Sequence, residues 1–413
     1  MFIRLNFFVN NFELFFTMEY KRSQYEQVTE RLREPRLRLQ VIIGPRQVGK
    51  STLIRQVLDA INMPFDAYNA DDVVNPGQTW LSMIWEKSRM KLKQGNEVER
   101  LLVIDEIHKV PNWSETVKAE WDRDTMNKTN LKVVLLGSSR MLLMQGLSES
   151  LMGRYELIRL PHWSFTEMRD AFGWTVEQYI YFGGYPGAAP YIHDLARWRQ
   201  YVLDSLIEPS IAKDVIYSTR ILKPQLLRQL FEIGSSYSGQ LLALKKIAAQ
   251  LQDAGNLTTL AGYLELLDQA GLLVGLQKYA QDKARKYNSI PKFQVHNSAL
   301  RNVYDDYTLD IAMINPEIWG RFVESAVGAY LVSQASIYGY HVYYWRETSD
   351  EVDFVLRRNT RTVAIEVKSG RRQRNQGLVF FDEQFKPWRS IVVGGDGFTV
   401  EEFLSMSLDE LFR

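Results

Sequence analysis

The chain has 413 residues, of which 46% are hydrophobic and 24% charged, and its 50 basic and 49 acidic side chains leave a formal net charge of +1. At about 150 residues per domain, this length predicts two or three domains, and the composition excludes a disordered chain, a collagen-like chain and a wholly basic nucleic-acid coat. The sequence contains no cysteine, which excludes disulfides, thiolate zinc sites, iron–sulfur clusters and cysteine nucleophiles and is consistent with a reducing cytoplasm.

The most apolar stretch near the N-terminus covers residues 7–16, where two asparagines and Glu13 interrupt it. This stretch is too short and too polar to cross about 30 Å of hydrocarbon, and no small-residue cleavage site follows it, as a signal peptide requires. We therefore expect a cytoplasmic protein with no membrane contact. Residues 1–17 are interpreted as a non-native or disordered extension.

Four short apolar runs alternate with helical patterns between residues 18 and 164. The runs cover residues 39–43, 64–68, 101–104 and 133–136. Short buried strands between helices predict a parallel sheet covered on both faces, so an α/β domain is expected here.

The rest of the chain divides into three stretches with different secondary-structure patterns. Residues 165–223 show helical patterns with one break at 183–187. Residues 224–295 give three helical segments followed by two short strands, an order typical of a winged helix. Residues 296–413 combine a helix near Trp319 with four apolar strands and a last helix near Glu401, which predicts a mixed α/β domain.

The sharpest motif follows the first apolar run. Residues 44–51 read Gly-Pro-Arg-Gln-Val-Gly-Lys-Ser and match the phosphate-loop pattern G-x-x-x-x-G-K-[ST]. The glycines let backbone N–H groups face phosphate oxygens, Lys50 adds positive charge at the β and γ phosphates, and Ser51 offers a hydroxyl to Mg²⁺. The predicted ATP-binding residues are Gly44, Pro45, Arg46, Gln47, Val48, Gly49, Lys50, Ser51 and Thr52.

A second motif of the same chemistry follows the run at 101–104. Asp105 and Glu106 come directly after this apolar strand, which is the Walker B arrangement. Asp105 is predicted to hold Mg²⁺, directly or through water, and Glu106 to orient and deprotonate the attacking water.

Two further positions are candidates for contact with the γ phosphate. The strand at 133–136 is followed by Gly-Ser-Ser, and Ser138 or Ser139 is expected to act as a sensor of that phosphate. Arg154 is a candidate catalytic cation that neutralises charge on the transferred phosphoryl group, within the chain or across a subunit boundary. The competing interpretations are an ordinary turn and a surface arginine.

A separate group of charged residues occurs near the C-terminus. The period of two in a strand places Asp353 away from the apolar face of its strand, and it places Glu366 and Lys368 together on the polar face of the next. Two carboxylates with room for water suit Mg²⁺ or Mn²⁺, and Glu324 on a preceding helix can add a third ligand. Lys368 is expected to position water or stabilise a transition state. The alternative is a pair of amphipathic strands with solvated charges.

These motifs together resemble a large prokaryotic family that pairs an AAA-type P-loop ATPase with a C-terminal domain of unknown function. Besides the phosphate loop, the resemblance rests on Ile-Asp-Glu-Ile-His at 104–108, Gly-Ser-Ser at 137–139, Gly-Arg at 153–154 and Phe-Gly-Gly-Tyr-Pro at 182–186. It implies ATP binding, hydrolysis and a winged helix between the two ends.

The C-terminal part resembles the PD-(D/E)xK nuclease superfamily. Asp353, Glu366 and Lys368 occupy the motif positions of this superfamily. Glu324 occupies the position of the acidic residue that the superfamily carries on a preceding helix. Relatives usually carry Asp at the position of Asn297, so this chain lacks that charge. The predicted fold class is α/β, with a P-loop parallel-sheet ATPase domain at 18–164, a helical connector at 165–223, a winged-helix-like domain at 224–295 and a mixed α/β nuclease-like domain at 296–413.

Basic side chains that could meet DNA phosphates cluster twice. One cluster is on the predicted wing and the other follows the Glu366 strand; they consist of Lys278, Lys283, Arg285, Lys286 and Lys292, and of Arg371, Arg372 and Arg374. The candidate recognition helix at 257–270 carries no lysine or arginine, which argues against base readout by this helix.

The sequence thus predicts a Mg²⁺-dependent ATPase that gates a nuclease-like DNA-processing domain. DNA and a second copy of the chain are the expected partners besides ATP. The alternative is a nucleotide-dependent switch whose nuclease-like domain is inactive and binds a partner or nucleic acid.

Overall fold

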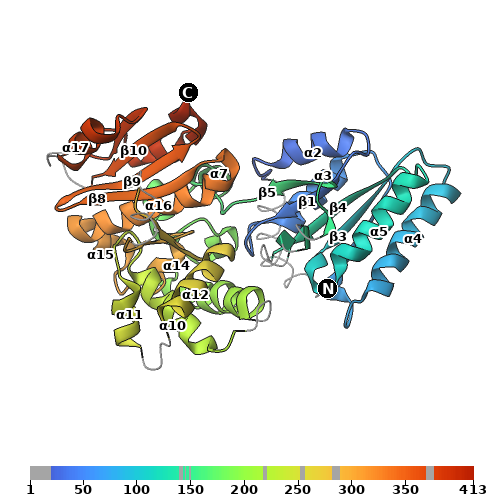
Figure 1. Ribbon diagram of the computed structural model, residues 1–413, viewed down its shortest axis with the longest axis horizontal. Coiled ribbons are helices and arrows are strands. Elements are labelled where there is room, and N and C mark those ends of the chain that lie inside the picture. Colours follow the sequence, from blue (N-terminus) through green and yellow to red (C-terminus); the bar gives the residue numbers. More distant parts are fainter. Residues whose placement is uncertain are drawn as a thin grey trace, which may run out of the picture. The chain divides into compact units, whose positions relative to one another are not determined.

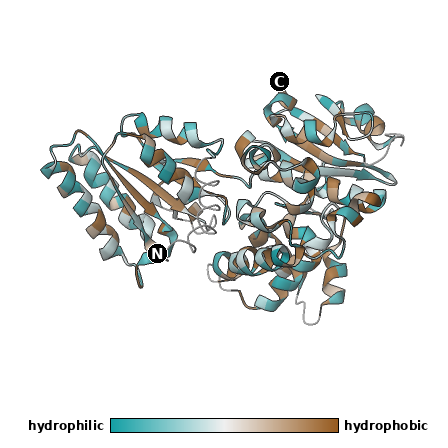
Figure 2. Cartoon of the chain, turned by 180° about the vertical axis from the view of Figure 1, so that it is seen from behind, coloured by the Kyte–Doolittle hydropathy of each residue, from teal (hydrophilic) through white to brown (hydrophobic). Residues whose placement is uncertain are grey.

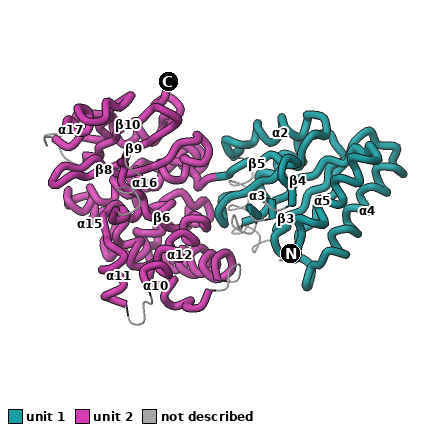
Figure 3. The backbone as a smooth tube through the Cα atoms, viewed as in Figure 1, with its two compact units in different colours: residues 1–160 teal, residues 161–413 magenta. Residues whose placement is uncertain are grey.

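The computed structural model describes residues 20–138, 143–144, 146–147, 150–216, 221–251, 256–280, 289–368 and 376–413. The chain forms two compact units, Met1–Leu160 and Pro161–Arg413 (Figure 3). They are called unit 1 and unit 2 below. The proposed extension at 1–17 lies outside the described residues.

Unit 1 is built on a parallel sheet, as the apolar runs predicted. Within the described residues the sheet has five strands in the order β2-β3-β4-β1-β5 (Figure 1). The strands are β1 (Leu39–Ile43), β2 (Phe65–Asn69), β3 (Arg100–Asp105), β4 (Leu131–Gly137) and β5 (Tyr155–Arg159).

Helices cover both faces of this sheet, because successive strand residues point to opposite sides. In β1, Val41 and Ile43 enter the core shared with α4 and α5, whereas Ile42 enters the core shared with α2 and α3. The hydropathy colouring shows the apolar strands between these amphipathic helices (Figure 2). The helical elements are α2 (Tyr25–Arg33), α3 (Lys50–Ala60), η1 (Ala70–Asp72), α4 (Gln78–Gln94), η2 (Ile107–Lys109) and α5 (Trp113–Met126).

The strand β5 has no counterpart among the apolar runs of the sequence. It reads Tyr-Glu-Leu-Ile-Arg and pairs in parallel with β1, with Leu39 opposite Tyr155 and Ile43 opposite Arg159. Most of its residues are only half-buried because β5 lies at the edge of the sheet. An edge strand does not need a continuous apolar sequence.

Unit 2 begins with the helices expected at 165–223. The helices α7 and α8 start at capping boxes in which Ser164 pairs with Glu167 and Thr175 with Gln178. Gly183 then ends α8 in a space where a Cβ would lie 2.0 Å from Asn297 Oδ1. The elements are α7 (Phe165–Phe172), α8 (Val176–Phe182), η3 (Pro186–Tyr191), α9 (Leu195–Tyr201) and the π-helical segments η4 (Val202–Ile207) and η5 (Ser210–Ile216).

Three helices and an antiparallel ribbon follow, in the order that suggested a winged helix. In the ribbon, Leu273 pairs with Val295 and Leu276 with Lys292. The winged-helix interpretation itself stays a prediction. The elements are α10 (Pro224–Ser236), α11 (Leu244–Gln250), α12 (Leu257–Gln269), β6 (Leu273–Leu276) and β7 (Lys292–Val295).

The last part of unit 2 is a mixed sheet, as predicted. Its order in the described residues is β11-β10-β9-β8, with β10 and β11 parallel and the other pairs antiparallel. The elements are α14 (Ala299–Asn302), α15 (Leu309–Ile314), α16 (Pro316–Tyr338), β8 (His341–Glu347), β9 (Asp350–Arg358), β10 (Arg361–Val367), α17 (Gln376–Phe385), β11 (Arg389–Val393), α18 (Val400–Ser405) and η6 (Leu408–Phe412). None of the helices in the described part of the chain has the length and apolar content of a transmembrane span.

Candidate functional site

The candidate ATP site lies at the carboxyl edge of the parallel sheet in unit 1. The strands β3, β4 and β1 are neighbours, and all three run in the same direction. Their carboxyl ends therefore bring Asp105, Ser138 and Gly44 to one edge, where open α/β sheets bind their ligands.

The phosphate loop has a backbone that its sequence explains. A Cβ on Gly44 would lie 2.3 Å from the carbonyl oxygen of Leu160, so only glycine fits there. Gln47 and Gly49 both adopt positive φ, at 62° and 89°. Such residues curl the chain so that successive N–H groups face one concavity, which is a binding site for anions.

The helix after the loop adds to this preference for an anion. The helix α3 begins at Lys50, and no side chain of the described residues caps its first turn. Uncapped N–H groups and the helix dipole favour a phosphate at this end. Lys50 is buried and its Nζ donates to the carbonyl oxygens of Gly44 and Pro45, at 2.9 and 2.8 Å, which places the ammonium inside the loop.

The Mg²⁺ ligands predicted from the sequence meet. Ser51 Oγ donates to Asp105 Oδ2 at 2.6 Å. A hydroxyl and a carboxylate of this kind, beside a phosphate loop, fit a Mg²⁺ ion that takes its remaining ligands from phosphates and water. The donor set is therefore suited to Mg²⁺ with a nucleotide.

Glu106 is held in a position suited to a general base. Its backbone is left-handed, with φ 50°, and its Oε2 accepts from Ser138 Oγ at 3.2 Å and from Ser138 N at 3.4 Å. His108 Nδ1 lies 3.2 Å from the same oxygen. Burial raises the pKa of Glu106, although the charge of Lys50 opposes this rise. A raised pKa moves a carboxylate closer to the range in which it accepts a proton efficiently at neutral pH.

The other two candidates of unit 1 fare differently. Ser138 contacts Glu106, and its role as a sensor of the γ phosphate stays a prediction. Ser139 lies outside the described residues. Arg154 lies at the edge of the sheet opposite the candidate ATP site, so it does not reach a phosphate bound by its own chain. Its backbone carbonyl accepts from Leu39 N at 2.8 Å, at the start of β1. The phosphate loop leaves the other end of this strand, about 13 Å away at about 3.3 Å per residue.

Arg154 has a local partner that explains its position. Its guanidinium holds Asp122 through two hydrogen bonds, at 2.8 and 2.9 Å, and this contact lowers the pKa of Asp122. The in-chain role expected for Arg154 is therefore corrected to an ion pair at the surface of unit 1.

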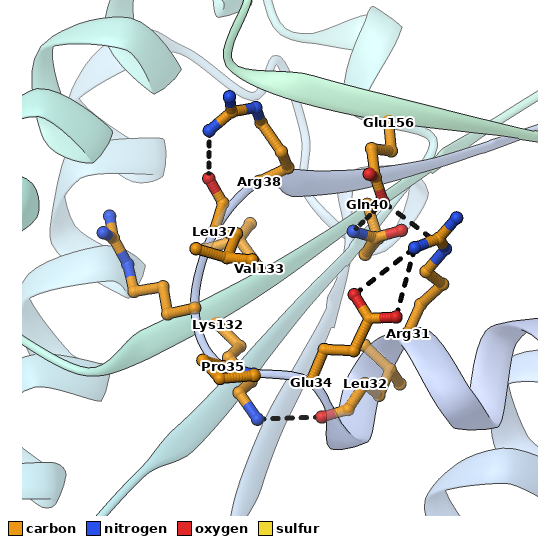
Figure 4. Close-up of a pocket in the computed structure, with 11 residues that line it drawn as sticks. Arg31, Leu32, Glu34, Pro35, Leu37, Arg38, Gln40, Lys132, Val133 and Glu156 are labelled. Atoms are coloured by element: carbon orange, nitrogen blue, oxygen red, sulfur yellow. Dashed lines mark hydrogen bonds and ion pairs between the residues drawn. The ribbon is translucent and has the colours of Figure 1, made fainter.

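A small hollow also lies at this amino edge. Figure 4 shows Gln40 and Glu156 in contact, with Arg31 bonded to Glu34 beside them. The hollow is lined by residues at the starts of β1, β4 and β5 and by the chain after α2. It lies at the opposite end of β1 from the phosphate loop and takes no part in the candidate ATP site.

In unit 2 the acidic residues singled out in the sequence come together on β9, β10 and α16. Asp353 Oδ2 accepts from the backbone N–H of Val367 at 2.8 Å, which ties β9 to β10. Lys368 Nζ donates to Glu366 Oε1 at 2.6 Å. Burial, with the charge of Asp353, raises the pKa of Glu366 to about 7.

A residue that the sequence analysis placed elsewhere lies among these carboxylates. Lys292 on β7 is fully buried, and its Nζ lies 2.7 Å from Glu324 Oε1, 3.4 Å from Asp353 Oδ1 and 3.5 Å from Glu351 Oε1. Burial alone would lower the pKa of Lys292, but the three carboxylates outweigh it and raise the pKa. Burial raises the pKa of Glu324 to about 7, against the opposing effect of Lys292.

This arrangement does not fit the metal site expected from the sequence. A divalent ion bound to Glu324 and Asp353 would be repelled by the Lys292 ammonium, which lies 2.7 Å from Glu324 Oε1 and 3.4 Å from Asp353 Oδ1. In the described part of the chain, no group of three or more acidic or histidine side chains has the arrangement of a metal site. The expected metal ligands Glu324, Asp353 and Glu366 are all partners of lysine ammonium groups in the structure, and metal binding by them stays a prediction.

One member of the basic patch expected on the wing is also corrected. Lys292 was part of that patch, but its side chain is fully buried and cannot meet DNA. Lys278 is half-buried. The remaining members of both patches, Lys283, Arg285, Lys286, Arg371, Arg372 and Arg374, lie outside the described residues. One sequence signal could have identified Lys292: it stands directly before an apolar strand, Phe-Gln-Val, where a charge needs a partner.

Asn297 has a structural role that explains its position. Its Oδ1 accepts from the backbone N–H groups of Gly184 and Ala299, both at 3.1 Å, and its Nδ2 lies 3.3 Å from His162 Nδ1. The residue is buried and joins the loop after α8 to α14. These contacts need an acceptor at Oδ1, which both Asn and Asp provide.

Three family models match consecutive parts of the chain. Residues 37–169 match the family described as "AAA domain". Residues 173–309 and 319–401 match two families described as domains of unknown function, DUF8612 and DUF4143. The comparison therefore supports an AAA ATPase type for unit 1 and assigns no activity to the C-terminal sheet.

Whole-chain relatives are distant. An uncharacterized protein of Haemophilus influenzae is 23% identical over 349 residues, which is 80% of this chain and 82% of that protein. Among solved structures, the Walker-type ATPase of Pyrococcus abyssi is 14% identical, covers 68% of this chain and 94% of its own, and has a TM-score of 0.48. The RuvB Holliday junction branch migration motor of Thermotoga maritima has 18% identity, the same coverages and a TM-score of 0.32.

At these TM-scores the structural likenesses carry no functional argument. The motifs, the parallel sheet and the family match agree on one conclusion. Residues 37–169 of this chain form an AAA-type domain with a P-loop ATPase fold.

Proposed function

We propose that the chain is a Mg²⁺-dependent ATPase. The observation that carries the proposal is the contact of Ser51 with Asp105 at 2.6 Å, beside an uncapped helix start and a buried Lys50. Hydroxyl, carboxylate and ammonium are the groups that bind Mg²⁺ and nucleotide phosphates in P-loop proteins.

In this proposal, each residue has one task. The loop N–H groups and Lys50 hold the β and γ phosphates, and Ser51 and Asp105 hold the metal ion. Bound Mg²⁺ neutralises charge that develops on the phosphate oxygens. Glu106 takes a proton from the attacking water, and Ser138 fixes the orientation of its carboxylate.

For the C-terminal domain, two functions compete. The sequence predicted a nuclease-like domain that processes DNA and is gated by ATP. The alternative is a nucleotide-dependent switch, in which the same domain is inactive and binds a partner or nucleic acid. The buried Lys292 among Glu324, Glu351 and Asp353 favours the switch, because its ammonium takes the place that a catalytic metal needs.

One experiment separates these functions. Hydrolysis of ATP and cleavage of plasmid and single-stranded DNA are measured in parallel, with Mg²⁺ or Mn²⁺ and with or without ATP. Wild type is compared with Lys50→Ala and Asp353→Ala. We expect ATP hydrolysis that depends on Lys50 and no cleavage under any condition. Cleavage abolished by Asp353→Ala would establish the nuclease, and hydrolysis that survives Lys50→Ala would refute the ATPase site.

A further inference from the structure

The most unusual charged group outside the ATP site is the ammonium of Lys292. Besides its three carboxylate neighbours, its Nζ lies 3.2 Å from the backbone oxygen of Asp353 and 4.9 Å from the centre of the Phe354 ring. Its side chain has no exposed surface. A buried ammonium needs several negative and aromatic partners, because these contacts offset the free-energy cost of removing a charge from water.

Lys368, the lysine at the nuclease motif position, is held much more loosely. Among the described residues its ion pair is with Glu366 at 2.6 Å, and its side chain keeps 16% of its surface exposed. A long side chain at such an edge is free to swing into solvent when another cation arrives. The side chain of Lys292 is fully buried, because it begins on a buried strand and its ammonium ends behind the carboxylates.

We propose that Lys292 is a resident cation that replaces the divalent metal of the nuclease-like site and keeps this site permanently metal-free. The ammonium supplies the positive charge that Glu324, Glu351 and Asp353 need, from within the chain. One oxygen of each of these carboxylates, which would otherwise be open to Mg²⁺ or Mn²⁺, lies 2.7, 3.4 or 3.5 Å from Nζ instead. The domain then keeps its nuclease-like shape without the chemistry.

The neighbouring carboxylate of Glu366 has an oxygen that Lys292 does not contact. Glu366 Oε2 is buried and has no hydrogen-bond partner within the described residues. A single oxygen does not make a metal site, since Mg²⁺ takes six ligands in near-octahedral geometry. This oxygen therefore does not restore metal binding while Lys292 is in place.

This inference deepens the switch proposal and does not depend on ATP hydrolysis. Its test uses the full chain without nucleotide and with Asp105→Asn in every sample, so that no Mn²⁺ is held at the phosphate loop. Binding of Mn²⁺ is measured by the loss of the free-ion electron paramagnetic resonance signal. The variants are Lys292→Met, which removes the ammonium at similar volume, and Lys292→Arg, which keeps a charge. The double variant Lys292→Met with Asp353→Asn removes one ligand of the new site.

The expected result is Mn²⁺ binding by Lys292→Met that is at least about 100-fold tighter than by the parent or by Lys292→Arg. The double variant should lose this binding. Mn²⁺ binding by the parent that Asp353→Asn removes would overturn the proposal, and so would a folded Lys292→Met that binds no Mn²⁺. ATP turnover is measured separately in chains with intact Asp105, so failure of the ATPase proposal leaves this test unaffected.

Thermal unfolding covers the case in which three uncompensated carboxylates unfold Lys292→Met. The proposal then predicts that Mn²⁺ raises its melting temperature and leaves that of the parent unchanged, because a ligand that binds only the folded state stabilises it. An unfolded Lys292→Met that Mn²⁺ fails to restore counts against the proposal, since the metal should replace the ammonium.

Discussion

The two charged sites of this chain contain the same kinds of side chain and differ in where the lysine is bonded. In unit 1, Lys50 donates to the carbonyl oxygens of the phosphate loop and leaves the carboxylate of Asp105 to Ser51. In unit 2, Lys292 lies against the carboxylates themselves. The first arrangement keeps metal ligands available and the second consumes them. Whether aspartate, glutamate and lysine form a metal site therefore depends on the atoms that the ammonium contacts.

The strongest test of this contrast is Lys50→Ala. Loss of the ammonium from the phosphate loop should lower ATP affinity or turnover by about 100-fold or more, because the backbone N–H groups of the loop carry no full positive charge to replace it. Binding of a fluorescent ATP analogue and phosphate release both measure the effect. Lys93→Ala, on the exposed side of α4, is the matched control. Unchanged binding and turnover in Lys50→Ala would remove the distinction between the two lysines.

The next largest effect is expected from Glu106→Gln. An amide cannot accept the proton of the attacking water, so turnover should fall by about 100- to 1000-fold while ATP stays bound. Glu30→Gln, on the exposed side of α2, should leave turnover unchanged. A Glu106→Gln variant that hydrolyses ATP at the normal rate would show that its carboxylate has no part in proton transfer.

A smaller effect is expected from Ser138→Ala. This change removes the hydroxyl bond to Glu106 Oε2 but keeps the backbone bond from the same residue. Loss of one hydrogen bond to a charged group predicts a fall in turnover of about tenfold, with ATP binding retained. The control is Ser82→Ala, on α4. A fall as large as that of Glu106→Gln would mean that Ser138 contacts the reacting groups themselves.

The smallest effect is expected at a buried ion pair that lies outside both charged sites. Asp66 is buried and accepts from Arg100 Nε at 2.7 Å and from Lys91. Burial alone would raise the pKa of Asp66. The hydrogen bonds from Arg100 and Lys91 outweigh this effect and lower the pKa below its ordinary value of 3.8. Asp66→Asn should therefore lower the free energy of unfolding by about 1–2 kcal/mol at neutral pH.

The pH dependence of this difference has a definite sign. A folded-state pKa below the unfolded value contributes stability above that value and loses it as the pH falls through the folded pKa. Denaturant unfolding at several pH values measures the difference in the free energy of unfolding between wild type and Asp66→Asn. This difference should disappear as the pH falls below 3.8. Asp59→Asn, an exposed position on α3, should show no difference. A difference that grows in acid would contradict the ion-pair explanation.

The sequence was sufficient to bring the parts of the candidate ATP site to one edge of the sheet, because these parts follow buried strands directly. In parallel strands the carboxyl ends meet, so contiguous motifs after β1, β3 and β4 must converge. Arg154 shows the limit of this reasoning. It also adjoins a strand, but it precedes β5 rather than following it, and a residue before a parallel strand lies at the opposite edge.

Lys292 could not be placed in the same way. It lies 61 positions before Asp353 in the chain, and only tertiary packing brings its side chain to that carboxylate. From the sequence, it was one of several lysines near a predicted wing. Its burial, which decides its chemistry, is a property of the complete fold of unit 2.

The last residue of unit 1 contacts the start of the phosphate loop. Leu160 is the last residue of this unit, its N–H donates to Ile43 O at 2.8 Å, and its carbonyl leaves no space for a side chain on Gly44. The first residue of the phosphate loop and the peptide that leads into Pro161 are thus pressed together. We therefore expect that any displacement of the phosphate loop on phosphate binding would also shift this peptide, because the two have no free space between them.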